Sequence, residues 1–137
     1  MSDLPHTQAR DIYGTVFRGG SAILLARVVG EDGRVLRPED ISNASYSVYE
    51  LDAHDPDVRR PVTGHVDRPL TVGEVLSPHL RRDFPWDVDE VGYNFRHVLE
   101  TVSTPCFPHA GRHYLVEVRF NPVRGQPILV RFRLWSI

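Results

Sequence analysis

The sequence predicts an all-β fold in which two antiparallel layers of strands pack against each other. Apolar and polar residues alternate through two segments near the C-terminal end, 111–120 and 127–137. This period of two indicates half-buried strands, because successive side chains of an extended chain point to opposite sides. Asn121, Pro122 and Gly125 break the pattern between the segments, so we expect an antiparallel hairpin. The apolar side of that hairpin needs a second layer to cover it.

The N-terminal part of the chain predicts an arm and two strands. Residues 1–10 are polar and contain Pro5, and we expect them to form a flexible arm before a single domain, residues 11–137. Residues 12–17 predict a short first strand. Residues 21–29 predict a second strand, and their almost continuous apolar character indicates that both of its faces are covered.

The middle of the chain is less regular. The Asp-Gly pair in residues 31–33 predicts a hairpin turn, and residues 38–40 predict a single helical turn before a strand at 44–51. Residues 52–69 contain three Pro, four Asp and few large apolar side chains. They predict a long surface loop with one weak strand at 62–66.

A short helix and one more strand precede the hairpin. Thr71 and Glu74 match a capping box, and Pro78 limits the helix to one or two turns. Residues 92–99 resume the alternation and predict a strand, which is followed by a connection at 101–110. One side of that strand holds Tyr93, Phe95, His97 and Leu99. Six or seven strands with one short helix favour a two-layer sandwich, and a small closed barrel is the alternative.

Two segments resemble parts of immunoglobulin-like domains. Gly111-Arg112-His113-Tyr114-Leu115-Val116-Glu117-Val118 is similar to the Gly-x-x-Tyr-x-Val-x-Val stretch that enters a late strand of many such domains. Trp86 to Phe95 precedes a strand as in small modules of bacteriophage tails, baseplates and other bacterial assemblies. The resemblance implies an immunoglobulin-like β-sandwich, with Tyr114 bonded to a backbone group upstream. It also implies a non-catalytic structural or docking module, although the chain lacks the paired cysteines of antibody-type domains.

Composition excludes several classes of protein. With 137 residues, 41% of them hydrophobic, the chain can bury a core without disulfide or metal. A net charge of −2 argues against nucleic-acid binding, and no apolar run reaches the ~20 residues of a membrane span. The N-terminus lacks the pattern of a signal peptide, and Cys106 is the sole cysteine. We therefore expect a protein that is cytoplasmic or assembled in the cytoplasm.

All 16 basic residues are arginine, which indicates either selection for guanidinium contacts at interfaces or codon bias in a GC-rich genome. The polar side of the C-terminal hairpin combines arginines with tryptophan, as protein interfaces do. We expect a second copy or a larger assembly, such as a phage-like virion or tail, to bury this side. In the alternative, Trp135 folds over the end of the sandwich and the arginines pair with Glu117 or the Asp-rich loops. The expected interface residues are Leu129, Arg131, Arg133, Trp135 and Arg119.

Other patterns are compatible with ligands. Cys106, His109 and His113 have the spacing Cys-x2-His-x3-His, with His97 as the nearest fourth ligand, but the second pair of a zinc motif is missing. Two Asp-rich segments give an alternative function, binding of calcium or carbohydrate with aromatic rings as a platform. The acidic residues are Asp52, Asp55, Asp57, Asp83, Asp87, Asp89 and Glu90, and the rings are Tyr46, Tyr49, Trp86 and Tyr93.

The sequence does not indicate an enzyme. It contains neither a nucleophile elbow nor a Gly-rich phosphate loop. Cys106 has His109 nearby, but Pro105 and Phe107 give it an apolar setting and no orienting acid lies close in sequence. We therefore expect no catalytic residue, no cofactor and no metal.

Overall fold

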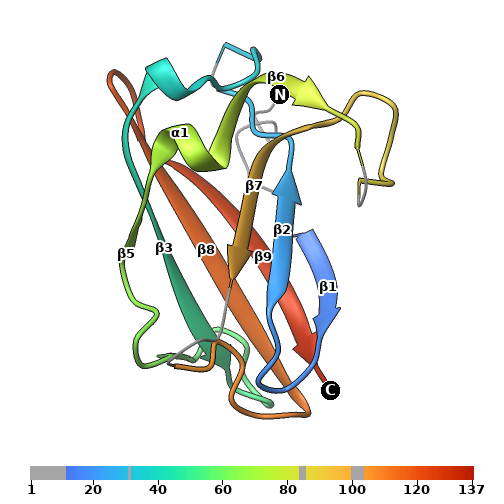
Figure 1. The fold of residues 1–137 in the computed structure, drawn as a ribbon. Helices are drawn as coiled ribbons and strands as arrows, with labels where there is room; N and C mark the ends of the chain where they lie inside the picture. The colour runs from blue at the N-terminus through green and yellow to red at the C-terminus, as the bar shows by residue number, and fades with distance from the viewer. Residues whose placement is uncertain (1–11, 31, 84–85, 100–103) are drawn as a thin grey trace, which may run out of the picture.

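The computed structural model describes residues 12–30, 32–83, 86–99 and 104–137. Within these ranges nine strands form two sheets, which face each other across one core (Figure 1). The all-β class is therefore confirmed. The closed barrel is wrong, because the strand pairings of the described ranges leave two separate sheets. The predicted arm, residues 1–10, lies outside the described residues.

The larger sheet contains the C-terminal hairpin. Its strands are β1 (Ile12–Val16), β3 (Ile41–Leu51), β4 (Arg59–Pro61), β5 (Arg68–Leu70), β8 (Arg112–Pro122) and β9 (Ile128–Ser136). They lie in the order β1-β9-β8-β3-β4, and β5 also pairs with β3. β1 runs parallel to β9, whereas the other pairs are antiparallel. The chain therefore brings its first described strand beside its last one.

The smaller sheet consists of β2 (Ala22–Ala26), β6 (Leu76–Arg81) and β7 (Tyr93–Leu99), in the order β2-β7-β6. The apolar run around β2 predicted that both faces are covered, and that prediction is wrong. Leu24 is buried in the core, but Ile23 is 49% exposed. The reason is that no further layer covers the outer side of this sheet in the described part of the chain.

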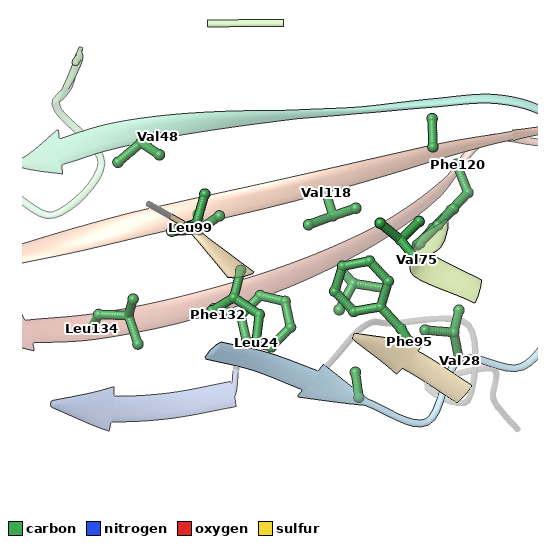
Figure 2. Packing of buried hydrophobic residues seen from close by; sticks show 14 of the residues in the cluster. Leu24, Val28, Val48, Val75, Phe95, Leu99, Val118, Phe120, Phe132 and Leu134 are labelled. Carbon is green, nitrogen blue, oxygen red and sulfur yellow. The ribbon is translucent and has the colours of Figure 1, made fainter. Parts of the chain in front are cut away.

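The predicted hairpin is confirmed as β8 and β9, and its apolar side faces the core. The register sets Val116 opposite Phe132, and both side chains are buried. Phe95 of β7 packs against this side of the hairpin from the smaller sheet (Figure 2). Its ring lies 5.6 Å from the ring of Phe120, edge to face, and 6.1 Å from that of Phe132. Buried apolar side chains from both sheets thus form one cluster.

The irregular middle segment forms the edge of the larger sheet. The weak strand predicted at 62–66 is wrong, since β4 and β5 lie on either side of those residues. Between them the chain bulges away from β3 while keeping two backbone hydrogen bonds to it. The Val62 N–H donates to the Val48 carbonyl, and the Val48 N–H donates to the His65 carbonyl. Pro61 and Pro69 lack an N–H, so each of the two short strands has fewer donors for a continuous ladder.

The two predicted helical turns are present, but the capping box is not. They are η2 (Pro38–Asp40) and α1 (Val72–Val75). The Thr71 side chain makes no capping hydrogen bond. In so short a helix the Thr71 carbonyl accepts the N–H groups of Glu74 and Val75, so the hydroxyl is not needed for the N–H of Glu74.

A buried asparagine fixes the start of β7. Asn94 is 1% exposed, and its side-chain oxygen accepts the Val28 N–H at 2.6 Å. Its amide nitrogen donates to the carbonyls of Val28 and Leu36, at 3.0 and 2.8 Å. These three bonds satisfy most of the amide's capacity and hold the chain around residues 28–36 against β7.

Gly92 allows β7 to approach β6 closely. Its φ is +107°, and a Cβ there would clash with the backbone carbonyl oxygen of Arg81. We expect Gly92→Ala to lower the free energy of unfolding by at least about 2 kcal/mol, because it adds a clash with backbone to left-handed strain. Urea denaturation measures this. Gly33→Ala is the matched control, since Gly33 also has a positive φ but open space around it. Equal losses in the two variants would contradict the close approach.

Candidate functional site

The outer side of the β8–β9 ribbon holds all five residues predicted to form an interface. The register sets Arg119 opposite Leu129, and His113 opposite Trp135. These side chains point outward because the residues between them fill the core. We call this surface the arginine face. Its residues are His113, Leu115, Glu117, Arg119, Leu129, Arg131, Arg133 and Trp135.

Trp135 is the large aromatic residue of the arginine face. It is 39% exposed, and its ring centroid lies 4.7 Å from that of His113, the residue opposite to it. Arg131 and Arg133 are half-buried on the same strand. Arg119 is exposed, and its Nε donates to the side-chain oxygen of Asn121. The indole therefore lies against the imidazole of His113, on the same side of β9 as Arg131 and Arg133, and remains partly open to solvent.

Two apolar residues that the sequence analysis missed extend this surface. The Ile137 N–H donates to the Val16 carbonyl, and the Arg18 N–H donates to the Ile137 carbonyl, both at 2.9 Å. This pattern sets Phe17 opposite Ile137 just beyond the ends of β1 and β9 (Figure 1). Phe17 is 70% exposed and Ile137 is 51% exposed.

One of the two missed residues, Ile137, was accessible to the same reasoning that found Trp135. Continuing the alternation one step past Trp135 places Ile137 on its side of the sheet, and Phe17 follows from the parallel pairing of β1 with β9. That pairing is not visible in the sequence, because the two strands lie at opposite ends of the chain. We call the exposed cluster of Phe17, His113, Trp135 and Ile137 the aromatic patch.

The arginine face is basic although the protein as a whole is acidic. Arg59 reaches over this side from β4: its guanidinium carbon lies 4.3 Å from the centre of the Tyr49 ring, and its Nη1 lies 3.6 Å from Glu117 Oε2. Asp67 also lies on this side, where its side chain is 3.5 Å from the hydroxyl of Ser47, the residue opposite Glu117. Counting Arg59 and Asp67, the face carries four arginines against two carboxylates, a formal charge of +2. The whole chain carries −2, so the remainder carries −4.

The spacing that resembled a zinc motif does not converge. Cys106 is fully buried, whereas His109 is exposed and binds Glu50, and His113 lies against Trp135. His97 contacts the ring of Tyr46 instead. Among the residues that the structure describes, no three His, Cys, Asp or Glu side chains are arranged to hold a metal ion.

Cys106 belongs to an internal network with His65, a residue that the sequence analysis did not single out. Its Sγ lies 3.5 Å from His65 Nε2. That nitrogen also lies 2.8 Å from the Thr104 carbonyl oxygen, which can only accept, so Nε2 carries the proton. His65 Nδ1 then accepts from the Tyr46 hydroxyl at 3.0 Å. The network ties the bulge after β4 to the segment before β8.

The buried setting makes the thiol of Cys106 unreactive. Burial raises its pKa to about 11, so it stays protonated at neutral pH. We expect its reaction with a thiol reagent to be at least about a hundredfold slower in the native protein than in denaturant, since the thiolate is the nucleophile and access needs local opening. Stopped-flow labelling in both conditions measures the ratio. Comparable rates would show that the thiol is accessible in the native state.

A second cluster holds the entry to β8. The Tyr114 hydroxyl accepts the backbone N–H of His109 at 2.8 Å and donates to Glu50 Oε1 at 2.9 Å. His109 Nδ1 lies 2.7 Å from the same oxygen. This is the upstream backbone contact that the resemblance implied for Tyr114. Burial raises the pKa of Tyr114 to about 12, so the phenol remains a donor.

Glu50 and His109 also line a cavity of about 370 Å³. Its walls include Thr63, Thr104 and Pro108. Burial alone would raise the pKa of Glu50, but the hydrogen bonds from His109 and Tyr114 outweigh it and lower the pKa. The carboxylate therefore serves as the acceptor that anchors this loop. A larger cavity, about 480 Å³, lies between residues 30–40 and 122–128 and is lined by oppositely charged side chains.

The Asp-rich segments use their carboxylates in local turns. Asp52 Oδ2 accepts the N–H groups of His54 and Asp55, both at 3.0 Å. Asp89 Oδ1 accepts those of Val91 and Gly92, also at 3.0 Å. Such Asx-type bonds stabilise the loops themselves.

The four rings considered as a platform lie in different surroundings. Tyr46 contacts His65 and His97 on the inner side of β3, whereas Tyr49 lies under Arg59 on the outer side. Trp86 and Tyr93 contact each other beside the smaller sheet.

Comparison of the sequence with protein-family models and with curated proteins gave no match. In the described part of the chain, the helices lack the length and apolarity that crossing a membrane would require.

Proposed function

We propose that this protein is a non-catalytic docking module, an immunoglobulin-like β-sandwich that binds copies of itself or attaches to a larger assembly. The observation that carries the proposal is the aromatic patch beside the arginines on one rigid sheet. Exposed aromatic and aliphatic side chains that cluster mark interaction sites, and Trp and Arg are the residues that most often dominate binding energy.

The strand order supports the immunoglobulin-like part of the proposal. In the proposed assignment, β2, β7 and β6 take the places of the B, E and D strands of such domains, and β9, β8, β3 and β4 take those of G, F, C and C′. The Tyr114 contact at the entry to β8 is that of a tyrosine corner. By its resemblance to tail and baseplate modules, a phage-like virion or tail is the first assembly to consider.

The described chemistry favours binding over catalysis. Cys106 is enclosed and protonated, so it is not an activated nucleophile. Glu50 accepts a hydrogen bond from Tyr114 and contacts His109, and these contacts anchor the loop before β8. The aromatic patch, in contrast, lies outside the core, and its side chains remain partly open to solvent.

The test compares association of the wild type with that of Phe17→Ser and Trp135→Ser, by sedimentation velocity up to millimolar concentration and against purified products of neighbouring reading frames. We expect each substitution to weaken binding by about 2 kcal/mol, roughly thirtyfold in Kd, as for a central interface residue. Val123→Ser is the matched control, since Val123 is 64% exposed but lies in the turn after β8. A strict monomer with no affinity for those products overturns the proposal.

A further inference from the structure

A second exposed apolar feature lies in the connection between β6 and β7. Residues 86–91, between β6 and β7, form what we call the valine loop. Val88 is 72% exposed and Val91 is 54% exposed. Asp87 and Glu90 are exposed beside them. The loop thus presents an apolar centre flanked by carboxylates.

The valine loop is held in one shape by hydrogen bonds within it and by an ion pair with Arg27. Asp89 accepts the N–H groups of Val91 and Gly92, and Arg27 Nη1 donates to both of its carboxylate oxygens at 2.9 and 3.1 Å. The Trp86 Nε1–H donates to the Asp89 carbonyl at 3.0 Å. A loop that is already ordered loses little conformational entropy when it binds.

The charges of the valine loop complement those of the arginine face. Arg27 neutralises Asp89, which leaves the carboxylates of Asp87 and Glu90 for an outside partner. Arg82 donates to the Glu90 carbonyl and so helps fix the loop. With Arg27 and Arg82 counted against Asp87, Asp89 and Glu90, the loop keeps a formal charge of −1. The aromatic patch is flanked by cations instead: Arg18 is exposed next to Phe17, and the charge of the arginine face is +2.

Geometry decides between two modes of self-association. Two arginine faces pressed together would set +2 against +2, which like-charge repulsion disfavours. The valine loop and the aromatic patch lie at opposite ends of the molecule, where β7 begins and where β9 finishes (Figure 1). One copy cannot bring them together, but consecutive copies can, in a head-to-tail contact.

We propose that the occupant of the aromatic patch is the valine loop of a second copy. This inference rests on the proposed docking function and names its partner. Val88 and Val91 cover Phe17 and Trp135, while Asp87 and Glu90 of the incoming loop face the arginines around the patch. Such a heterologous contact joins copies into a ring, or into a helical filament when the rotation does not close.

The test is a charge swap between the two surfaces. Arg18→Glu with Arg133→Glu reverses the patch, and Asp87→Arg with Glu90→Arg reverses the loop. Because Arg133 is half-buried, Arg18→Glu alone is the second patch variant, and circular dichroism checks that each variant folds. We expect each variant to self-associate at least about tenfold more weakly than the wild type. We expect an equimolar mixture of the two double variants to associate again, with the two variants alternating in one-to-one proportion, because each patch then meets a loop of opposite charge.

Asp57→Arg with Glu74→Arg is the matched control for the loop variant, since it makes the same change in net charge on exposed residues elsewhere. Apart from the effect of overall charge, the Kd for its self-association should remain within about twofold of the wild-type value. If neither surface variant differs from this control, or the mixture fails to pair, the head-to-tail inference is wrong. In that case the docking function would still stand if Trp135→Ser lost binding to a neighbouring gene product, because the patch would then serve a different partner. Absence of any association overturns both.

Discussion

We expect Phe95→Ala to lower the free energy of unfolding by about 3–5 kcal/mol, the range for removing a fully buried phenylalanine. Phe95 is fully buried and is the residue of the smaller sheet whose ring touches Phe120 and Phe132 of the larger one. Truncation removes the contact that spans the two sheets and leaves a cavity between them (Figure 2). The loss comes from both the transfer of apolar surface and the unfilled space.

Urea denaturation followed by circular dichroism measures this loss. Phe17→Ala is the matched control, because Phe17 is the same residue type but 70% exposed. It should change the free energy of unfolding by no more than about 0.5 kcal/mol. Similar losses in the two variants would mean that the sheets do not pack through Phe95.

We expect Glu50→Gln to lower the free energy of unfolding by about 1–3 kcal/mol at neutral pH. The carboxylate oxygen of Glu50 is the acceptor for the Tyr114 hydroxyl and lies 2.7 Å from His109 Nδ1. An amide is a weaker acceptor than a carboxylate, and it carries no charge for His109. The anchoring of the segment before β8 is therefore weakened.

The effect of Glu50→Gln depends on pH in a defined direction. The folded state lowers the pKa of Glu50, so the unfolded chain binds a proton more readily. Stability from this carboxylate is therefore fully present above its unfolded pKa of about 4.3 and is lost as the pH falls through the lower folded pKa. The difference between wild type and Glu50→Gln should shrink below about pH 4.

Chemical denaturation at a series of pH values tests this dependence. Glu74→Gln is the control, since Glu74 is exposed and the structure shows no side-chain bond for it. A difference between wild type and Glu50→Gln that stays constant into the acid range would contradict the role of the charged carboxylate.

The fold could be predicted from the sequence where local periodicity decides the structure. The hairpin of β8 and β9 and the inner side of β7 follow from alternation, because a period of two needs no knowledge of distant contacts. β2 could not be interpreted correctly, since an apolar run does not reveal whether a layer covers Ile23. β4 and β5 were missed because each has three residues and gains its pairing from β3.

The candidate site divides in the same way. Alternation alone placed Arg131, Arg133 and Trp135 on one face. Phe17 joined them only through the parallel pairing of β1 and β9, which is a contact between the two ends of the described chain. The network of His65 with Cys106 depends on a bulge at the sheet edge, and its 41-residue separation leaves no local pattern. Long-range contacts of this kind are set by the fold rather than by neighbouring residues.

Fluorine NMR of protein labelled with fluorotryptophan tests the central claim most directly, because the chain contains two tryptophans and one of them lies in the aromatic patch. Trp135→Phe assigns the two resonances. With rising protein concentration, or with an added assembly partner, the Trp135 resonance should shift and lose its sensitivity to solvent isotope as the ring becomes covered. A Trp135 resonance that stays unchanged while the protein associates would show that docking occurs elsewhere.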